Sequence, residues 1–306
     1  MTAERQFSPR VLAQKRPALE LRGRVFALVR SFFQQNGYLE VQTPVRVLTP
    51  ALESHIDAEP SGTRWLRTSP ELHMKRMVCA GYEKIFQIGP CFRQGERGDR
   101  HLPEYTMLEW YHAGVTSEDL IDETSALFRF LCEGLGRTRF SGLDLAAPPE
   151  ILHVRDAFQQ WAGWDPVAAF DEDRFDLDLV EKVEPQLQKH RVPLIFRDFP
   201  AARAALARLR PEDPRVADRW ELYLGGMEIA NAYTELTDPS EQRHRFEQCA
   251  RERKARGQAV YPLDEKFLQA LEEGMPDCAG IALGMDRLLM ILGESQTIDE
   301  VVAFTE

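Results

Sequence analysis

Apolar side chains recur every three or four residues between positions 18 and 36, a spacing that predicts an amphipathic helix. Gly37 follows directly and is able to end that helix, because glycine readily adopts the left-handed backbone conformation found after helices. Residues 38–45 then alternate between apolar and polar side chains up to Pro44, which predicts a strand interrupted by proline. This order of elements occurs in many folds, so the segment alone identifies none.

A second pattern predicts two strands joined by a charged turn. Residues 84–89 and 104–111 have the composition of strands, and the residues between them are rich in glycine, arginine and glutamate. A strand, a polar turn and a strand indicate an antiparallel hairpin. Before the hairpin, Ser69 as N-cap, Pro70 at the first helical position and Glu71 in the first turn predict the start of a helix.

The rest of the chain continues in the same mixed pattern. Predicted antiparallel strands with helices around them indicate an α+β fold. No repeat or low-complexity linker marks a boundary, so we expect one domain over residues 1–306. A strand is expected at 219–230, and helices are expected at 118–134, 154–161, 175–189, 241–257, 265–273 and 284–292.

Composition narrows the class of protein. Of the 306 residues, 43% are hydrophobic and 28% are charged, as in globular proteins with a core. No apolar run has the length of a membrane span, residues 1–16 lack the features of a signal peptide, and the five cysteines are scattered, so we expect a cytosolic protein. The net charge of −11 disfavours binding to a nucleic-acid backbone and suits a nucleotide site with a basic protein partner.

Two stretches, residues 92–111 and 280–288, each place an arginine beside acidic and glycine residues. The guanidinium of Arg93 suits a phosphate group, and the predicted helix start at Arg287 favours anions. Together they predict an ATP site in which a carboxylate attacks the α-phosphate. Taken alone, Arg93 fits a surface ion pair better than a phosphate site, and the glycines near Arg287 could equally well serve only helix–strand packing. No Walker or dinucleotide-binding glycine loop is present.

Glu228 and Glu235 are candidates to hold Mg²⁺, which takes one or two carboxylates together with phosphate oxygens. Seven residues apart on a regular strand, they would point to opposite faces, so this role requires a bulge or a turn. An ordinary edge strand is the alternative. Glu71 could bind a substrate amine or only complement the helix dipole, and Tyr111 fits a core position as well as a site.

The three stretches 37–45, 92–109 and 280–288 resemble motifs 1, 2 and 3 of the class II aminoacyl-tRNA synthetases. Within that family the chain is similar to lysyl-tRNA synthetases, and most of all to short bacterial paralogs that attach (R)-β-lysine to elongation factor P. The runs that carry this narrower resemblance are 68–76, 106–111, 227–231, 235–238 and 274–278.

The resemblance implies an antiparallel sheet flanked by helices, a homodimer formed through motif 1, and a reaction that uses ATP and Mg²⁺. β-Lysine would be adenylated and transferred to a lysine side chain of elongation factor P, with tRNA an unlikely partner. By the same resemblance, Arg93 would hold the α-phosphate, Tyr105 and Arg287 would sandwich adenine, and Glu228 and Glu235 would coordinate Mg²⁺. The implied amino-acid-binding residues are Ser69, Glu71, Tyr111, Glu235 and Ala282. The implied ATP-pocket positions are Arg93, Gly95, Glu96, Leu102, Tyr105, Glu228, Ile229, Gly284 and Arg287.

Two features favour the ligase over the synthetase. The motif 1 helix begins near residue 18, which leaves no room for an anticodon-binding domain. Ala282 stands at a position where the synthetases have glycine. Departures from the family pattern affect the motif 2 loop: Gly95 replaces a glutamate, Leu102 an asparagine and His112 an arginine. The alternatives are an adenylating enzyme that acts on tRNA or a small molecule, and a non-catalytic paralog, which the retained arginines and carboxylates disfavour.

Overall fold

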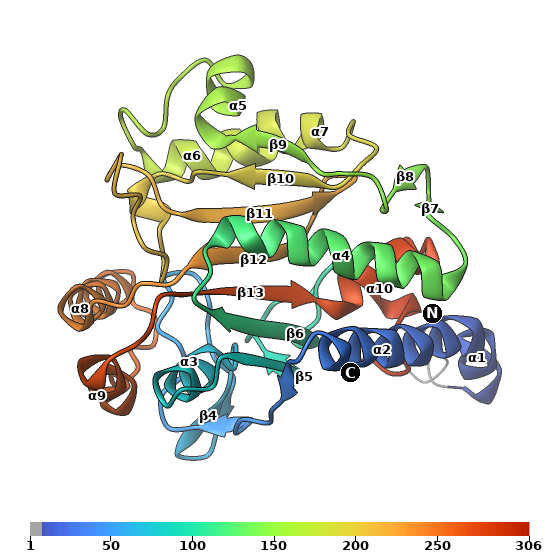
Figure 1. Ribbon diagram of the computed structural model, residues 1–306, viewed down its shortest axis with the longest axis horizontal. Helices are drawn as coiled ribbons and strands as arrows, with labels where there is room; N and C mark the ends of the chain where they lie inside the picture. The colour runs from blue at the N-terminus through green and yellow to red at the C-terminus, as the bar shows by residue number, and fades with distance from the viewer. Residues whose placement is uncertain (1–7, 306) are drawn as a thin grey trace.

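An eight-stranded sheet forms the centre of the protein (Figure 1). The structure is a computed structural model that describes residues 8–305. The inner strand pairs are antiparallel, whereas the strand at each edge runs parallel to its neighbour. The predicted α+β class is therefore confirmed. From one edge to the other the strands are β1 (Leu39–Glu40), β5 (Lys84–Phe92), β6 (Glu104–Ala113), β13 (Cys278–Gly284), β12 (Met227–Thr234), β11 (Arg219–Leu224), β10 (Leu194–Arg197) and β9 (Glu150–His153).

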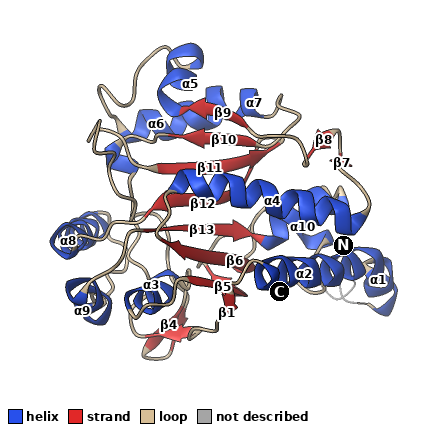
Figure 2. Ribbon diagram, in the orientation of Figure 1, coloured by secondary structure: helices blue, strands red, loops and turns tan. Residues whose placement is uncertain are grey.

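Helices surround this sheet, as Figure 2 shows. Two long helices, α2 (Arg16–Gln35) and α4 (Ser117–Leu135), lie across one face of the sheet. They contribute to the largest hydrophobic core, where Phe33 and Leu127 pack with Trp110, Ile281 and Leu283 from the sheet. Two small sheets complete the fold, one of β2 (Arg46–Val47), β4 (Arg64–Leu66) and β3 (Pro60–Ser61) and one of β7 (Arg139–Phe140) and β8 (Leu143–Asp144). The α-helices are α1 (Pro9–Gln14), α2 (Arg16–Gln35), α3 (Glu71–Cys79), α4 (Ser117–Leu135), α5 (Val154–Trp161), α6 (Glu172–Asp178), α7 (Glu184–Leu187), α8 (Pro239–Ala255), α9 (Glu265–Glu273) and α10 (Met285–Gly293).

Most of the predicted elements are confirmed. The hairpin of β5 and β6 is antiparallel, and α2, α4, α5, α9 and α10 occupy the expected segments. Helix α3 begins at Glu71, one residue later than predicted. The N-cap is therefore Pro70, and the prediction of Ser69 at that position is wrong. The Ser69 hydroxyl nevertheless accepts a hydrogen bond of 2.9 Å from the Glu71 backbone N–H in the first turn.

Two predicted elements are wrong, and a third is helical but irregular. The single strand over 219–230 is a hairpin of β11 and β12, because Gly225 and Gly226 adopt positive φ angles of 58° and 78° and reverse the chain. The helix over 175–189 is interrupted by a π-helical turn at Leu179–Val183, just before Pro185 in the first turn of α7. The strand over 38–45 is reduced to the two residues of β1.

Within the described residues, no helix combines the length and the apolar character needed to cross a membrane. The first seven residues of the segment 1–16, in which no signal peptide was expected, lie outside the described residues.

Candidate active site

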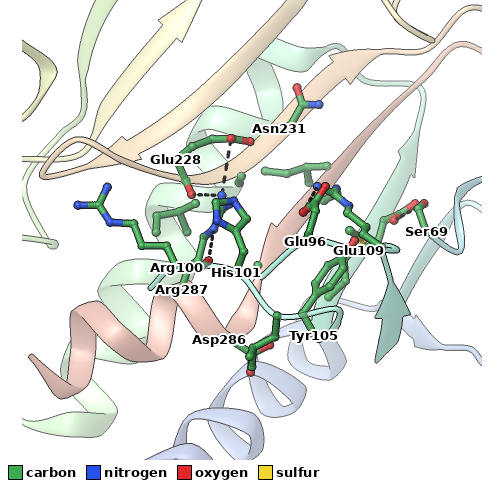
Figure 3. Close-up of a pocket in the computed structure, with 18 of the residues that line it drawn as sticks. Ser69, Glu96, Arg100, His101, Tyr105, Glu109, Glu228, Asn231, Asp286 and Arg287 are labelled. Atoms are coloured by element: carbon green, nitrogen blue, oxygen red, sulfur yellow. Dashed lines mark hydrogen bonds and ion pairs between the residues drawn. The ribbon is translucent and has the colours of Figure 1, made fainter. Parts of the chain in front are cut away.

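A cavity of about 480 Å³ is lined by residues of the central strands β6, β12 and β13, with others from the loops beside them (Figure 3). Successive side chains of a strand point to opposite faces, so Gly280, Ala282 and Gly284 of β13 share the face on which the cavity lies. These residues are small, whereas their register partners on the neighbouring strands are larger, among them Tyr111 on β6 and Tyr233 on β12. The small residues of β13 therefore form the floor of a depression, and the flanking strands form its walls.

One end of the cavity carries Arg93, in the turn after β5. Its guanidinium lies over the Tyr105 ring, 5.2 Å from the ring centroid, and forms an ion pair of 3.6 Å with Glu96. The Tyr105 hydroxyl donates a hydrogen bond of 2.9 Å to the Thr68 carbonyl, which fixes the ring. Among the described residues, the buried Nε of Arg93 has no hydrogen-bond partner. A buried guanidinium with a free donor suits an anionic ligand.

Arg287, in the first turn of α10, reaches the cavity from the other side. Its Nη1 donates to the Glu228 carbonyl at 2.8 Å and forms an ion pair of 3.6 Å with the Glu228 carboxylate. Its Nη2 lies 2.5 Å from Nε2 of His101, and its Nε donates to the Arg100 carbonyl at 3.3 Å (Figure 3). Burial and the nearby Arg287 charge lower the pKa of His101. Arg287 therefore joins β12 to the motif 2 loop.

The other end of the cavity is acidic and buried. Lys75 of α3, with no exposed side-chain surface, forms ion pairs of 2.5 Å with both Glu71 and Glu235. Glu109 accepts hydrogen bonds from Ser69 Oγ at 3.0 Å and from the Tyr111 hydroxyl at 2.7 Å.

Burial raises the pKa of both Glu109 and Glu235 to about 8, with the Glu71 charge acting in the same direction. The carboxylates of Glu71, Glu109 and Glu235 lie around the single ammonium group of Lys75. When all three are ionised, the cluster therefore carries two negative charges that no cation balances. Buried charges are stable only when they are paired, so this end suits a ligand with two cationic groups.

The bulge required for Glu228 is present in β12. Tyr223 pairs with Glu228 and Leu222 pairs with Ala230, so Ile229 is the extra residue. The two carboxylates predicted to share Mg²⁺ are nevertheless paired with different cations: Glu228 with Arg287 and the fully buried Glu235 with Lys75.

The acidic neighbour of Glu228 is Glu221 on β11, whose pKa is raised to about 7 by burial and then by the Glu228 charge. Within the described residues, no three or more histidine, cysteine or acidic side chains are grouped as a metal site.

The structure brings nearly all the predicted site residues to one cavity. Glu235 is the exception: it is fully buried behind Gly280, and its carboxylate comes close enough to exclude a Cβ at that position. Tyr105 lies against Arg93, and both Tyr105 and Arg287 line the cavity. The predicted residues that line the cavity are Ser69, Glu71, Arg93, Gly95, Glu96, Leu102, Tyr105, Tyr111, Glu228, Ile229, Ala282, Gly284 and Arg287.

The site also contains residues to which the sequence analysis assigned no role. Lys75 follows Glu71 by one helical turn, a spacing that signals an ion pair. Glu109 shares a strand face with Tyr111, which the period of two would have indicated. Asp286 accepts from Arg22 at 2.5 Å and from the Thr106 N–H at 2.6 Å, so it joins α10 to α2 and β6. Glu53 lies on a loop, and no sequence pattern around it indicated a role in the site.

Comparison with known proteins agrees with this geometry. The family model for tRNA synthetases class II (D, K and N) matches residues 5–306. A protein named elongation factor P–(R)-β-lysine ligase from Haemophilus influenzae is 40% identical, over 92% of this chain and 93% of its own length. Proteins of the same name from Avibacterium paragallinarum and Klebsiella pneumoniae are 37% and 39% identical; the alignments cover 99% and 94% of this chain and 98% and 95% of theirs.

Proposed function

This chain belongs to the class II tRNA synthetases of the D, K and N group, and we propose that it is an ATP-dependent ligase that attaches (R)-β-lysine to a lysine side chain of elongation factor P. The observation that carries the proposal is the polarity of the cavity. Arg93 and Arg287 line the part of the cavity away from its buried end. The acidic cluster of Glu71, Glu109 and Glu235 lies at the buried end. Such a cavity complements a nucleotide triphosphate on one side and a diamino acid on the other.

In the first step, an oxygen of the β-lysine carboxylate forms a bond to the α-phosphorus of ATP while the bond to the pyrophosphate oxygen breaks. Arg93 stabilises the negative charge that develops on the α-phosphate, because its guanidinium is held in place on Tyr105 before the reaction starts. The products are β-lysyl-AMP and pyrophosphate. Binding of both substrates in one cavity supplies the alignment that this step needs.

In the second step, the neutral side-chain amine of a lysine on elongation factor P attacks the carbonyl carbon of the adenylate. The carbon–oxygen bond to AMP breaks, AMP leaves and the amine loses a proton. The acidic end holds the diamino side chain of β-lysine during both steps, so the carbonyl carbon stays near Arg93.

For Mg²⁺, we propose Glu228 as the principal ligand, with Glu221 beside it in place of the predicted Glu235. Glu221 and Glu228 are acidic neighbours on adjacent strands, and Glu221 also pairs with Arg219 at 2.7 Å. Glu235 is fully buried beside Lys75 and does not line the cavity. Two neighbouring carboxylates fit a divalent cation, and Mg²⁺ commonly binds one or two carboxylates plus phosphate oxygens. When bound, the ion would neutralise phosphate charge and orient the pyrophosphate leaving group.

We also propose a homodimer formed through the motif 1 region. Leu39 and Leu48 in that region are 50% and 56% exposed, which suits burial against a second copy. We further propose that residues 1–306 form one catalytic unit. We place the enzyme in the cytoplasm, where a translation factor acts. Light scattering coupled to size-exclusion chromatography measures the oligomeric state directly.

The test of function is the intact mass of elongation factor P after incubation with this protein, ATP, Mg²⁺ and either (R)-β-lysine or α-lysine. The expected result is a mass gain of one lysyl group, larger in yield with the β-isomer. No gain with either isomer would exclude this acceptor. Release of pyrophosphate would then separate an adenylating enzyme with another acceptor, such as tRNA or a small molecule, from a non-catalytic paralog.

A further inference from the structure

Glu53 is a carboxylate of the cavity wall that nothing in the proposed reaction uses. It lies on the loop after β2, and its side chain lines the cavity. Among the described residues, the carboxylate accepts no hydrogen bond and has no cation within ion-pair distance. Burial raises the pKa of Glu53 to about 7, against the opposing effect of the Arg93 charge. An acidic group left without a partner in a cavity wall is a candidate ligand for a substrate cation.

The cavity lining and the ion pairs show which groups surround Glu53. Glu53, Glu71 and Arg93 line the same cavity, and the Arg93 and Glu71 charges are the ones that act most strongly on Glu53. Glu71 in turn belongs to the buried acidic cluster, because it shares the ammonium of Lys75 with Glu235. Glu53 therefore has the arginine of the phosphate end and a member of the acidic cluster as its charged neighbours.

We propose that Glu53, next to Glu71, binds the substrate ammonium group that is nearer the reacting carboxylate. The inference rests on the proposed function, because it assumes a diamino acid whose carboxylate lies at Arg93. With the carboxylate there, the nearer ammonium of β-lysine, on the third carbon, falls beside Glu53. The farther ammonium, on the sixth carbon, extends to Glu109 at the buried end of the cavity.

Arg253 of α8 holds this loop in place. Its guanidinium is fully buried, and its Nη1 donates to the Glu53 carbonyl at 2.7 Å and to the Ile56 carbonyl at 2.9 Å. Its Nη2 is hydrogen-bonded to Asp57, and the group lies over the Tyr261 ring, 4.9 Å from the centroid. The loop has no helix or strand of its own, so these bonds fix the backbone that carries Glu53. Arg253 is therefore a positioning residue.

The experiment compares the wild-type enzyme with Glu53→Gln, which keeps the shape and removes the charge. Amino-acid-dependent exchange of pyrophosphate into ATP gives KM for (R)-β-lysine and for ATP separately. We expect KM for β-lysine to rise about tenfold to hundredfold, as for the loss of a buried charged hydrogen bond, and KM for ATP to change less than about twofold. The probe 6-aminohexanoate keeps the carboxylate and the farther amine but lacks the nearer ammonium, so Glu53→Gln should not weaken its use.

Glu96→Gln is the matched control, because it removes the other carboxylate beside Arg93 and is expected to act on ATP. Arg253→Lys should reproduce part of the Glu53→Gln effect on KM for β-lysine, with the fold checked by circular dichroism.

An equal rise of both KM values in Glu53→Gln, or an equal loss with 6-aminohexanoate, would mean that Glu53 acts through Arg93 and would overturn the inference. Wild-type exchange that no lysine isomer stimulates would instead refute the proposed function, and the role of Glu53 with it.

Discussion

The ring of Tyr111 lies directly against the backbone of Gly280. The two residues are register partners on β6 and β13. A Cβ built on Gly280 would come closer to the Tyr111 ring, and also to the Glu235 carboxylate, than the 3.0 Å that real Cβ atoms keep. Glycine is therefore required here by the approach of two side chains, and this contact forms the closed end of the cavity.

Replacement of Gly280 by alanine should displace Tyr111 or Glu235. We expect a loss of about 1–3 kcal/mol of stability, as for other overpacked positions, and at least a tenfold rise in KM for β-lysine. Thermal unfolding and pyrophosphate exchange measure the two effects. Gly284→Ala is the control for stability, because its methyl group would meet no atom nearer than 3.8 Å. A Gly280→Ala enzyme with the wild-type melting temperature and KM would contradict this account.

Replacement of Lys75 by methionine should destabilise the protein strongly. The change leaves Glu71 and Glu235 buried without their cation, a loss that typically costs about 3–5 kcal/mol. Lys182→Met is a matched control, since Lys182 pairs with Asp178 at the same spacing and the same 2.5 Å distance but is 45% exposed. We expect less than about 1 kcal/mol there. Equal shifts of the denaturation midpoint in the two variants would show that burial of the lysine does not determine the loss of stability.

The parts of the fold that follow from local periodicity could be predicted from the sequence. The hairpin of β5 and β6 is fixed by two alternating runs around a polar turn, and α2 by its apolar stripe. The two site arginines could be predicted because each stands beside acidic and glycine residues, and the same stretches resemble motifs of a known family. One available signal was missed: the pair Gly225–Gly226 between two apolar runs is typical of a hairpin turn, and it divides the strand expected over 219–230.

The remaining features depend on contacts between distant segments. Lys75 and Glu235 are 160 residues apart, and no spacing rule relates them. Their pairing also gives Glu235 a cation partner other than the metal that the family resemblance implied for it. Glu53 stands on a loop whose position is set by Arg253 of α8, so neither residue has a periodic context. Such roles become visible only once the sheet has brought the segments together.

The acidic end of the cavity should make both stability and substrate binding depend on pH. The pKa of Glu109 and of Glu235 is raised to about 8 in the folded protein, chiefly by burial. Between the unfolded value, near 4.5, and pH 8, the folded state holds protons that the unfolded state has lost, so these groups make stability fall as pH rises through that window.

Binding of β-lysine as a dication should therefore release protons at pH 7, since it favours the ionised carboxylates. Calorimetry in two buffers of different ionisation enthalpy counts them, and we expect roughly one proton or more per ligand. The Glu109→Gln variant should release fewer. Proton uptake, or a count unchanged by that substitution, would show that the cluster is already ionised in the free protein.

Replacement of Arg93 by alanine should abolish adenylation and leave the fold intact. The guanidinium lies at the cavity wall on Tyr105 and contributes no hydrogen bond to the described residues, so its removal breaks one ion pair of 3.6 Å with Glu96 and little else. Loss of a preorganised cation at the α-phosphate is expected to lower the rate of pyrophosphate exchange by about a hundredfold or more. Arg243→Ala is the control: Arg243 is not among the residues that line the cavity, its side chain is 38% exposed and it is paired with Glu265 at 2.6 Å, so its loss should change the exchange rate less than about threefold. Exchange by the Arg93→Ala enzyme at the wild-type rate, with an unchanged melting temperature, would remove Arg93 from the chemistry and leave Arg287 as the arginine that contacts the phosphates.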